Sequence, residues 1–301
     1  MRPITTSFLL VVFLALTVFG VMLAPLASAD TLNTADNFAV LAGSTITNAG
    51  AGVLGATVIT GEMGVSPGTA CTGFTTCPIT GPGTSGTVHL ADGVALQAQK
   101  DLTTAYTTLA GLSGTLEPNN LTGLTLGPGV YDVGAAALAG ALTLNDHGVA
   151  GSQFIFLISS SLTTSPGSSI NVSGLLPGDS VFWVVGSTAT LGNNTVFDGN
   201  ILALTSIIFD PGAIDPCGRA LARNGAVTFA GQDPTSLIEN QVSITCSGNL
   251  AGSNGLAGGT TTTGGGGGTP VPEPGTLLLV ALGVAGALVM TRISGPKLSR
   301  A

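Results

Sequence analysis

The feature that most constrains the fold is a rhythm of very short apolar segments separated by Gly, Asn, Asp and Pro. From Phe182 to Gly212 the chain reads FWVVGSTATLGNNTVFDGNILALTSIIFDPG, and turn signals recur every six to ten residues along most of the chain. Such spacing is typical of a β-solenoid, in which each coil contains two or three short strands with glycine at the corners. A β-sandwich with irregular strands is the alternative that this pattern leaves open.

Composition favours a mainly β protein outside the cytoplasm. The chain has 301 residues, of which 46 are Gly and only 7% are charged, and it contains little Lys or Glu for building helices. A net charge of −8 argues against a nucleic-acid partner, because phosphate contacts need a basic surface. We expect no cofactor.

One segment nevertheless has the periodicity of a helix. Its apolar residues recur at spacings of three and four, which places them on one helical face. They are Ala91, Ala95, Ala98, Leu102, Ala105 and Leu109. Gly111 supplies a natural end. Because most of these side chains are small, we expect the helix to pack closely against a flat partner, namely a sheet.

The other expected elements are short strands bounded by turn residues. They cover residues 38–41, 44–47, 57–60, 124–126, 153–158, 180–185, 188–191, 201–204, 206–209 and 226–229.

The N-terminus has the organisation of a secretory signal peptide. Arg2 precedes an apolar stretch over residues 8–26, and Ala27-Ser28-Ala29 supplies small residues for cleavage. We therefore assign residues 1–29 to a signal peptide and expect the mature chain to begin near Asp30. A transmembrane anchor is the alternative.

The C-terminus has three consecutive parts. Pro272-Glu273-Pro274 is followed by the apolar run 277–290 and then by a basic tail that includes Arg292. This order resembles the PEP-CTERM sorting signal of Gram-negative bacteria, over residues 271–301. The resemblance implies processing by an exosortase-type enzyme after transient anchoring in the inner membrane by the short helix. An ordinary C-terminal anchor is the alternative, and it has the same topology, with the basic tail in the cytoplasm.

Between the two signals lie a folded region and a linker. Residues 247–270 are rich in Gly, Ser and Thr without apolar periodicity, as expected of a flexible linker. Residues 30–246 remain as one folded domain, a length that suits a single all-β domain.

All four cysteines lie in this domain, which the export signal directs to an oxidising compartment. Four cysteines allow three pairings. We favour Cys71–Cys77, which closes a small loop, and Cys217–Cys246, which ties the end of the domain back. We expect no metal site, because the cysteine and histidine spacings do not fit zinc.

Several segments of the domain resemble the ice-binding-like family of bacteria and fungi. They include FAVLAGSTITNAG (38–50), LTLGPGVYDV (124–133), QFIFLISSSLTTSPGSSI (153–170) and GRALARNGAVTF (218–229). The resemblance runs in collinear order over the whole domain. It implies an all-β fold that is a discontinuous triangular β-solenoid, with one long α-helix packed along a side.

Two short motifs match catalytic or nucleotide-binding patterns, but neither is flanked by the residues or elements that such a site requires. Residues 64–68 spell G-x-S-x-G, but Pro67 follows the serine and cannot supply the N–H that an oxyanion hole needs. Residues 81–86 spell G-x-G-x-x-G without the strand and helix that a dinucleotide site requires. We interpret both as turns or loops.

One cluster contains charges of both signs: Asp198, Asp210, Asp215, Arg219 and Arg223. We expect the two arginines to cap turns and pair with neighbouring aspartates at a corner of the solenoid. A polysaccharide-active enzyme would instead need carboxylates along one open groove. No such groove is evident in the sequence, so we expect a protein that is not an enzyme.

The informative surface is the one that carries threonine. Its side chain offers a methyl and a hydroxyl group on a stiff χ1. Stacked strands would repeat such groups at ~4.7–4.9 Å across strands and ~6.6–7 Å along one, comparable to oxygen spacings in ice. The candidate ice-binding residues are Thr45, Thr47, Thr143, Thr163, Thr188 and Thr190. Other positions expected to point outward are Thr57, Thr60, Thr164, Ser168 and Thr195.

We therefore expect an exported, monomeric protein at the cell surface or in the medium that adsorbs to ice and limits its growth. The expected partners are an ice surface, the exosortase-type enzyme and an exopolysaccharide. The alternative function is a structural or adhesive protein of the exopolysaccharide matrix without ice activity.

Overall fold

The computed structural model describes residues 31–50, 57–74, 84–174, 176, 178–236 and 238–246. The expected signal peptide, the linker and the sorting signal with its short helix lie outside the described residues. Within the described part, no helix is both long and apolar enough to cross a bilayer.

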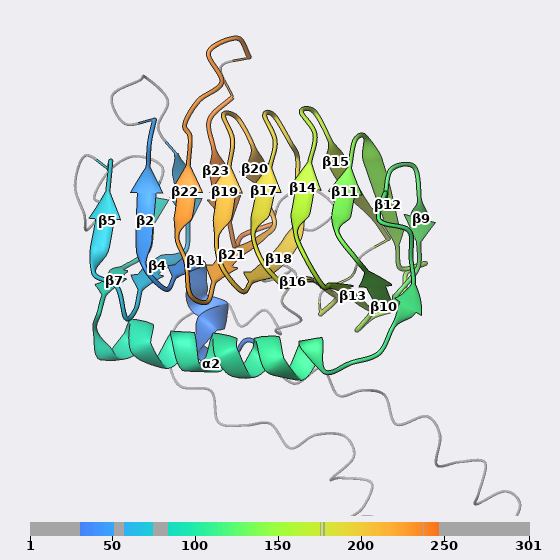
Figure 1. Ribbon diagram of the computed structural model, residues 1–301, viewed down its shortest axis with the longest axis horizontal. Coiled ribbons are helices and arrows are strands. Elements are labelled where there is room, and N and C mark those ends of the chain that lie inside the picture. Colours follow the sequence, from blue (N-terminus) through green and yellow to red (C-terminus); the bar gives the residue numbers. More distant parts are fainter. Residues whose placement is uncertain are drawn as a thin grey trace, which may run out of the picture. The chain divides into compact units, whose positions relative to one another are not determined.

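The protein is a β-solenoid whose strands pair in parallel along three sides (Figure 1). The first side, which we call the helix-side sheet, has nine strands. In spatial order they are β7 (Val88–Leu90), β4 (Glu62–Val65), β1 (Phe38–Ala42), β21 (Gly218–Ala222), β18 (Gly199–Ala203), β16 (Ser180–Val185), β13 (Gln153–Ile158), β10 (Gly129–Val133) and β8 (Thr115–Leu116).

The second side, which we call the open sheet, has seven strands. They are β11 (Ala136–Leu138), β14 (Leu162–Thr164), β17 (Ala189–Leu191), β19 (Ile207–Phe209), β22 (Val227–Phe229), β2 (Thr45–Asn48) and β5 (Ala70–Thr72). These strands lie side by side in this order in Figure 1.

The third side is divided into two smaller sheets. One contains β15 (Ser169–Ser173), β12 (Ala141–Asn145) and β9 (Thr125–Leu126), and the other contains β20 (Ile214–Asp215), β23 (Gln241–Ser243), β3 (Val58–Thr60) and β6 (Thr84–Ser85). Isolated bridges at Val196 connect the two. The third side is therefore less regular than the open sheet.

The coils are not stacked in chain order. The first strand, β1, pairs with β21 of the last coil on one side and with β4 on the other. The chain then passes through β7 and returns to the opposite end of the solenoid, where β8 pairs with β10. This non-sequential stacking is the discontinuity expected from the family resemblance.

Helix α2 (Gly93–Ala110) connects β7 to β8 at the opposite end of the solenoid, and it runs along the helix-side sheet (Figure 1). Asp92 caps its N-terminus by accepting the N–H of Ala95 at 2.8 Å, and Gly111 is its C-cap. Eighteen residues extend about 27 Å, or between five and six strand spacings. The helix buries the predicted apolar face, except that Ala91 lies before its first turn with a φ of 50°.

The helix packs on apolar side chains that point outward from the helix-side sheet. Its buried residues and the 3₁₀ helix η1 (Asn33–Asn37) join Phe38, Phe182, Leu202 and Leu221 in one cluster. Small Ala95 and Ala98 allow close approach to the flat sheet, as the sequence predicts.

The interior of the solenoid is a second, narrower core. Tyr131, Phe156 and Trp183 occupy equivalent positions on neighbouring coils and stack with ring centroids 5.2 and 4.0 Å apart. Such ring pairs stabilise beyond the area that they bury. This stacking of equivalent positions supports the parallel register of β10, β13 and β16.

The predicted Cys217–Cys246 disulfide is confirmed. It joins the start of the last coil to the end of the described chain, 29 residues later. Cys71 is also disulfide-bonded, but Cys77 lies outside the described residues, so their pairing stays a prediction.

Candidate functional site

A straight row of outward side chains crosses all seven strands of the open sheet. The strand registers pair Ala137 with Thr163, Thr163 with Thr190, Thr190 with Ile208, Ile208 with Thr228, Thr228 with Thr47, and Thr47 with Thr72. We call these seven residues the central row. At ~4.8 Å per strand, its six intervals extend about 29 Å.

The sequence of each strand explains why these side chains face outward. In β17, Ala189 and Leu191 are buried, so the residue between them, Thr190, points to the opposite face. The same alternation places Ile208 and Thr228 outside, because their neighbours on both sides are buried. An apolar–Thr–apolar triplet is therefore the local signal for this row.

The open sheet has few groups that would disturb a flat surface. None of the residues in its seven strands is charged. Hydroxyl groups on this sheet contact one another: Thr72 Oγ1 donates to Thr47 Oγ1 at 3.3 Å, and Thr45 Oγ1 lies 3.4 Å from Thr47 Oγ1. These contacts restrain the side chains of Thr45, Thr47 and Thr72 on strands β2 and β5, in addition to the intrinsic stiffness of threonine.

Five of the six predicted ice-binding residues lie on or beside the open sheet. Thr47, Thr163 and Thr190 belong to the central row. Thr45 lies two residues before Thr47 on the same face, and Thr188 lies two residues before Thr190, where its Oγ1 is 2.8 Å from that of Thr205. The sequence pattern thus brings these five together.

Thr143 does not join them. It lies in β12 on the third side, paired with Thr125 and Asn171.

Four other threonine and serine positions predicted to point outward are buried, so that prediction is wrong for them: Thr57, Thr164, Ser168 and Thr195. Thr163 and Thr164 are consecutive on one strand, so only one of the two can face out. Thr164 Oγ1 lies 2.7 Å from Thr195 Oγ1, which satisfies both hydroxyls inside the solenoid.

Sequence reasoning missed four members of the central row. Thr72 and Thr228 are threonines that it did not single out, and Ala137 and Ile208 are apolar. The triplet Val227-Thr228-Phe229 repeats the pattern of Ala189-Thr190-Leu191, so the signal for Thr228 was present in the sequence.

The other two sides are less suited to contact an extended flat partner. The helix-side sheet is covered by α2 and η1. The third side is split into two sheets that meet at Val196. The open sheet is therefore the one broad face that remains continuous and uncovered in the described part of the chain.

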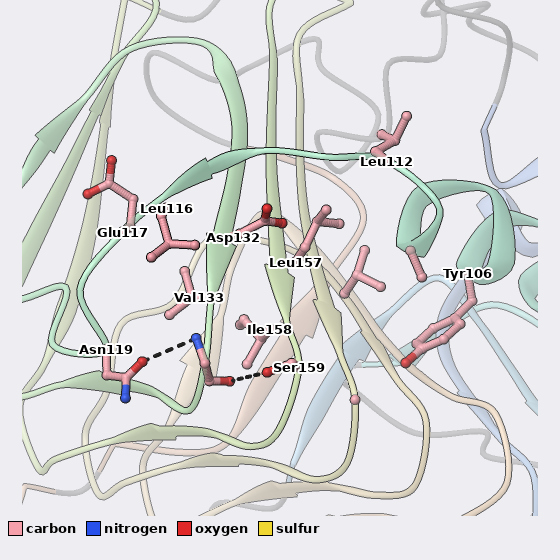
Figure 2. A pocket seen from close by; sticks show the side chains of 14 residues that line it. Tyr106, Leu112, Leu116, Glu117, Asn119, Asp132, Val133, Leu157, Ile158 and Ser159 are labelled. Atoms are coloured by element: carbon pink, nitrogen blue, oxygen red, sulfur yellow. Dashed lines mark hydrogen bonds between the residues drawn. The ribbon is translucent and has the colours of Figure 1, made fainter.

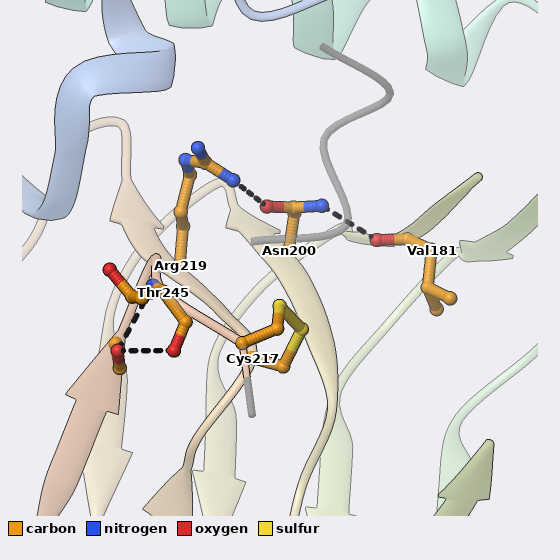
Figure 3. The surroundings of a disulfide bond; sticks show 7 residues. Val181, Asn200, Cys217, Arg219 and Thr245 are labelled. Atoms are coloured by element: carbon orange, nitrogen blue, oxygen red, sulfur yellow. Dashed lines mark hydrogen bonds between the residues drawn. A yellow bond between two sulfur atoms is a disulfide. The ribbon is translucent and has the colours of Figure 1, made fainter. Parts of the chain in front are cut away.

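The mixed charge cluster has a structural role different from the one predicted. Arg219 is fully buried, and its Nη2 lies 2.8 Å from Oδ1 of Asp36 in η1. Its Nη1 donates to Asn200 Oδ1 at 2.9 Å, and Asn200 Nδ2 donates to the Val181 carbonyl at 3.0 Å (Figure 3). Arg219 therefore joins η1 to the helix-side sheet instead of capping a corner.

Arg223 also departs from the prediction, because it forms no ion pair with a described aspartate. Its guanidinium lies over the ring of Tyr106 in α2, 4.7 Å from the centroid.

Two of the three aspartates of this cluster, Asp198 and Asp215, are buried and do not line an open groove. Asp215 is fully buried, and burial together with the nearby charge of Asp198 raises its pKa well above the usual range, although Arg219 opposes this shift. Burial also raises the pKa of Asp198 to about 7. Carboxyl groups buried in this way cannot reach a polysaccharide, so they do not form a glycosidase pair.

A hollow of about 590 Å³ lies near the C-terminal end of α2 (Figure 2). Leu112, Leu116 and Leu157 line it together with Glu117 and Asp132. Gly134 N–H donates to Asn119 Oδ1 at 3.1 Å, and Ser159 Oγ donates to the Gly134 carbonyl at 3.2 Å, which secures one wall. The Ser159 hydroxyl is thereby engaged by a main-chain carbonyl and not by a carboxylate base.

The described ranges contain no cluster suited to a metal ion. There, no three His, Cys, Asp or Glu side chains come together in a way that could hold an ion.

Two family descriptions match this sequence. Residues 40–234 match the family described as Ice-binding-like, and residues 270–292 match the PEP-CTERM protein-sorting motif. The second match agrees with the predicted sorting residues Pro272, Glu273 and Pro274 and points to export towards the cell surface. The first is a family of ice-binding proteins, not enzymes, in agreement with the prediction.

Individual proteins are similar over most of the domain. An ice-binding protein of Nostoc sp. (strain HG1) is 48% identical over 207 residues, which cover 67% of this chain and 72% of the relative. The crystal structure of an ice binding protein from an Antarctic biological consortium has a TM-score of 0.60 at 42% identity, over 70% of this chain and 89% of that one.

A third similar structure comes from a fungus. The ice-binding protein of the Antarctic ascomycete Antarctomyces psychrotrophicus has a TM-score of 0.61 at 35% identity, over 72% of this chain and 98% of that one. The match over residues 40–234, the extent of these similarities and the discontinuous solenoid lead to one conclusion: the chain belongs to the ice-binding-like family.

Proposed function

We propose that this protein binds ice through the open sheet and limits ice growth around the cell. The observation that carries the proposal is the central row, a straight line of threonine, alanine and isoleucine on an uncharged and uncovered sheet. The related proteins named above are ice-binding proteins, which supports the same function here.

The mechanism is adsorption without turnover. Methyl and hydroxyl groups repeat at ~4.8 Å between strands and ~6.7 Å along a strand, so water ordered above them can merge with an ice lattice. The β-branched threonines have stiff side chains, and few long charged chains need to be ordered, so little conformational entropy is lost on contact. A rigid solenoid keeps the sheet in place.

We propose that Thr47, Thr163, Thr190, Thr228 and Thr72 make the main contacts, with Thr45 and Thr188 at the flank. Ile208 lies between Thr190 and Thr228 in the register and supplies apolar contact within the same line. Thr143 is not part of this site, because it lies on the third side.

Export and surface attachment complete the proposal. Residues 1–29 direct secretion, the helix within 271–301 anchors the protein transiently in the inner membrane, and an exosortase-type enzyme processes the PEP-CTERM motif. The mature protein is a monomer whose second partner is an exopolysaccharide. The alternative, a purely structural matrix protein, shares this route but has no ice activity.

A single ice crystal observed in a solution of the purified protein tests the function. We expect the crystal to become faceted and to stop growing within a temperature interval below the melting point. A round crystal that grows freely would contradict ice binding and favour the structural matrix protein.

A further inference from the structure

A second hollow lies at the corner between the helix-side sheet and the open sheet, next to the middle of α2. Its volume is about 340 Å³, within the ~300–1,000 Å³ range of small-molecule sites. Lys100 and Arg223 line it, and the remaining lining residues carry no acidic group: Ser66, Pro67, Leu96, Gln99, Thr103 and Asn224. We call it the corner hollow.

The charge of this hollow is unusual for the protein. The whole chain has a net charge of −8, and the described residues contain three cations, Lys100, Arg219 and Arg223. Arg219 is buried and paired with Asp36. The other two cations, Lys100 and Arg223, both line the corner hollow.

Neither of these two cations is neutralised by a described acidic residue. The nearest acid in sequence to Lys100 is Asp101, whose carboxylate accepts hydrogen bonds from Thr34 and Gln97. Arg223 stacks on Tyr106, and its Nε has no hydrogen-bond acceptor among the described residues. The ring fixes the plane of the guanidinium, and because Nε is buried, the two terminal Nη groups are the donors that a ligand in the hollow would meet.

We propose that the corner hollow binds the carboxylate of an acidic sugar unit in a polysaccharide. A planar guanidinium matches a carboxylate with two parallel hydrogen bonds, and a lysine ammonium adds a second positive charge. Hydroxyl and amide groups of Ser66, Thr103 and Asn224 can bind sugar hydroxyls. The net negative charge of the protein disfavours densely charged polyanions, so a sparsely charged acidic polysaccharide fits better than nucleic acid.

This proposal gives a chemical class to the exopolysaccharide partner and does not depend on ice binding. The corner hollow borders the open sheet but shares no residue with the central row, so the two sites can be tested separately. A polysaccharide held at the corner would keep the open sheet free at the edge of the matrix.

Calorimetric titration of the purified protein with a trimer of galacturonic acid tests the site. The matched ligand is the same trimer with its carboxyls methyl-esterified, which keeps the rings and removes the charge. We expect saturable binding of the acid, no binding of the ester, and loss of binding at about 1 M salt, where charges are screened within ~3 Å. Equal binding of the two trimers would overturn the proposal.

Two substitutions separate the contributions of the cations. Lys100→Gln, on the exposed face of α2, should weaken binding about tenfold, the loss typical of one charge-assisted hydrogen bond. Arg223→Lys keeps the charge but removes the planar fork, and it should weaken binding by a similar factor. Unchanged affinity in both variants would rule out the corner hollow.

Two controls distinguish the remaining outcomes. Inorganic sulfate that binds as tightly as the trimer and displaces it would reduce the site to a general anion site and overturn the sugar assignment. Thr190→Tyr on the open sheet should leave trimer binding unchanged, so failure at the corner hollow is distinguishable from failure of the ice surface.

Discussion

Arg219 and Asp36 are 183 positions apart in the sequence, yet Arg219 donates from Nε and Nη2 to the Asp36 carbonyl at 2.9 and 2.6 Å and also forms an ion pair with its carboxylate. The pair connects the 3₁₀ helix at the start of the domain to the last coil. Because Arg219 is fully buried, this contact is central to the stability of the junction between the first and last coils.

Removing the acid from this pair should be strongly destabilising. Asp36→Ala leaves a buried guanidinium without its carboxylate, and we expect a loss of about 3 kcal/mol in the free energy of unfolding. Urea denaturation measures this change in the free energy of unfolding. Lys100→Gln on the surface is the control and should change stability by less than ~0.5 kcal/mol. A second control, Asp36→Ala combined with Arg219→Met, should recover part of the loss, because no unpaired charge remains.

The open sheet should lose ice activity when a bulky side chain interrupts the central row. Thr190→Tyr places a ring in the middle of the row, so we expect thermal hysteresis to fall to a small fraction of its original value while the circular dichroism spectrum is unchanged. Thr143→Tyr makes the same substitution on the third side and should retain full activity. Equal losses in both variants would contradict the assignment of the face.

Thr228 offers an independent test of the same face, because sequence reasoning alone did not select it. Thr228→Tyr should reduce thermal hysteresis as strongly as Thr190→Tyr, since the two residues flank Ile208 in one register. Ice-recrystallisation assays provide a second readout. Full activity of Thr228→Tyr would limit the ice-contact area to the strands on the Thr190 side of Ile208.

Stability should fall as the pH rises from about 4 to about 7. Burial raises the pKa of Asp198 to about 7 in the folded protein, above the ordinary value of 3.8. The folded state therefore holds a proton that the unfolded state has lost, so its stabilising effect is complete below pH ~4 and disappears as the pH passes 7. For one group, this shift corresponds to an upper limit of about 4 kcal/mol.

Thermal unfolding at several pH values measures this effect. Asp198→Asn should make the profile flatter between pH ~4 and pH ~7, and it keeps the main-chain carbonyl that accepts the Trp183 indole at 3.1 Å. An identical slope in Asp198→Asn would assign the pH dependence to another group.

The Cys217–Cys246 disulfide closes a loop with a sequence separation of 29. In the chain-entropy description, this closure stabilises the fold by about 3–4 kcal/mol. Replacing both cysteines by serine should lower the melting temperature by several degrees, and addition of a reductant should have a smaller effect on the variant than on the parent protein. The comparison measures the contribution of this bond.

Much of the fold could be predicted from local sequence. The apolar run Gln153–Ile158 and the run Ser180–Val185 form strands with the predicted bounds, because each is continuous and limited by turn residues. The amphipathic pattern located α2, and its alanines correctly indicated a flat partner. Strand β21 was not among the predicted strands, since alanine and glycine weaken its β signal.

The assignment of residues to faces was harder to predict. Thr143 and Thr190 have similar neighbours, but one lies on the third side and the other on the open sheet, because face membership depends on where each coil turns. A shift of one residue in a strand reverses its exposure, as the buried Thr164 beside the exposed Thr163 demonstrates. The partnership of Asp36 with Arg219 has no local signal at all.

The adjacency of β1 and β21 has a consequence for biosynthesis. Phe38 leaves the ribosome 180 residues before Gly218, so β1 can pair with β4 but lacks its other partner, β21, throughout most of translation. Parallel pairing over such a sequence distance is slow, because loop-closure entropy must be overcome first. The first coil can therefore be joined to the last one only after β21 has been synthesised, late in translation.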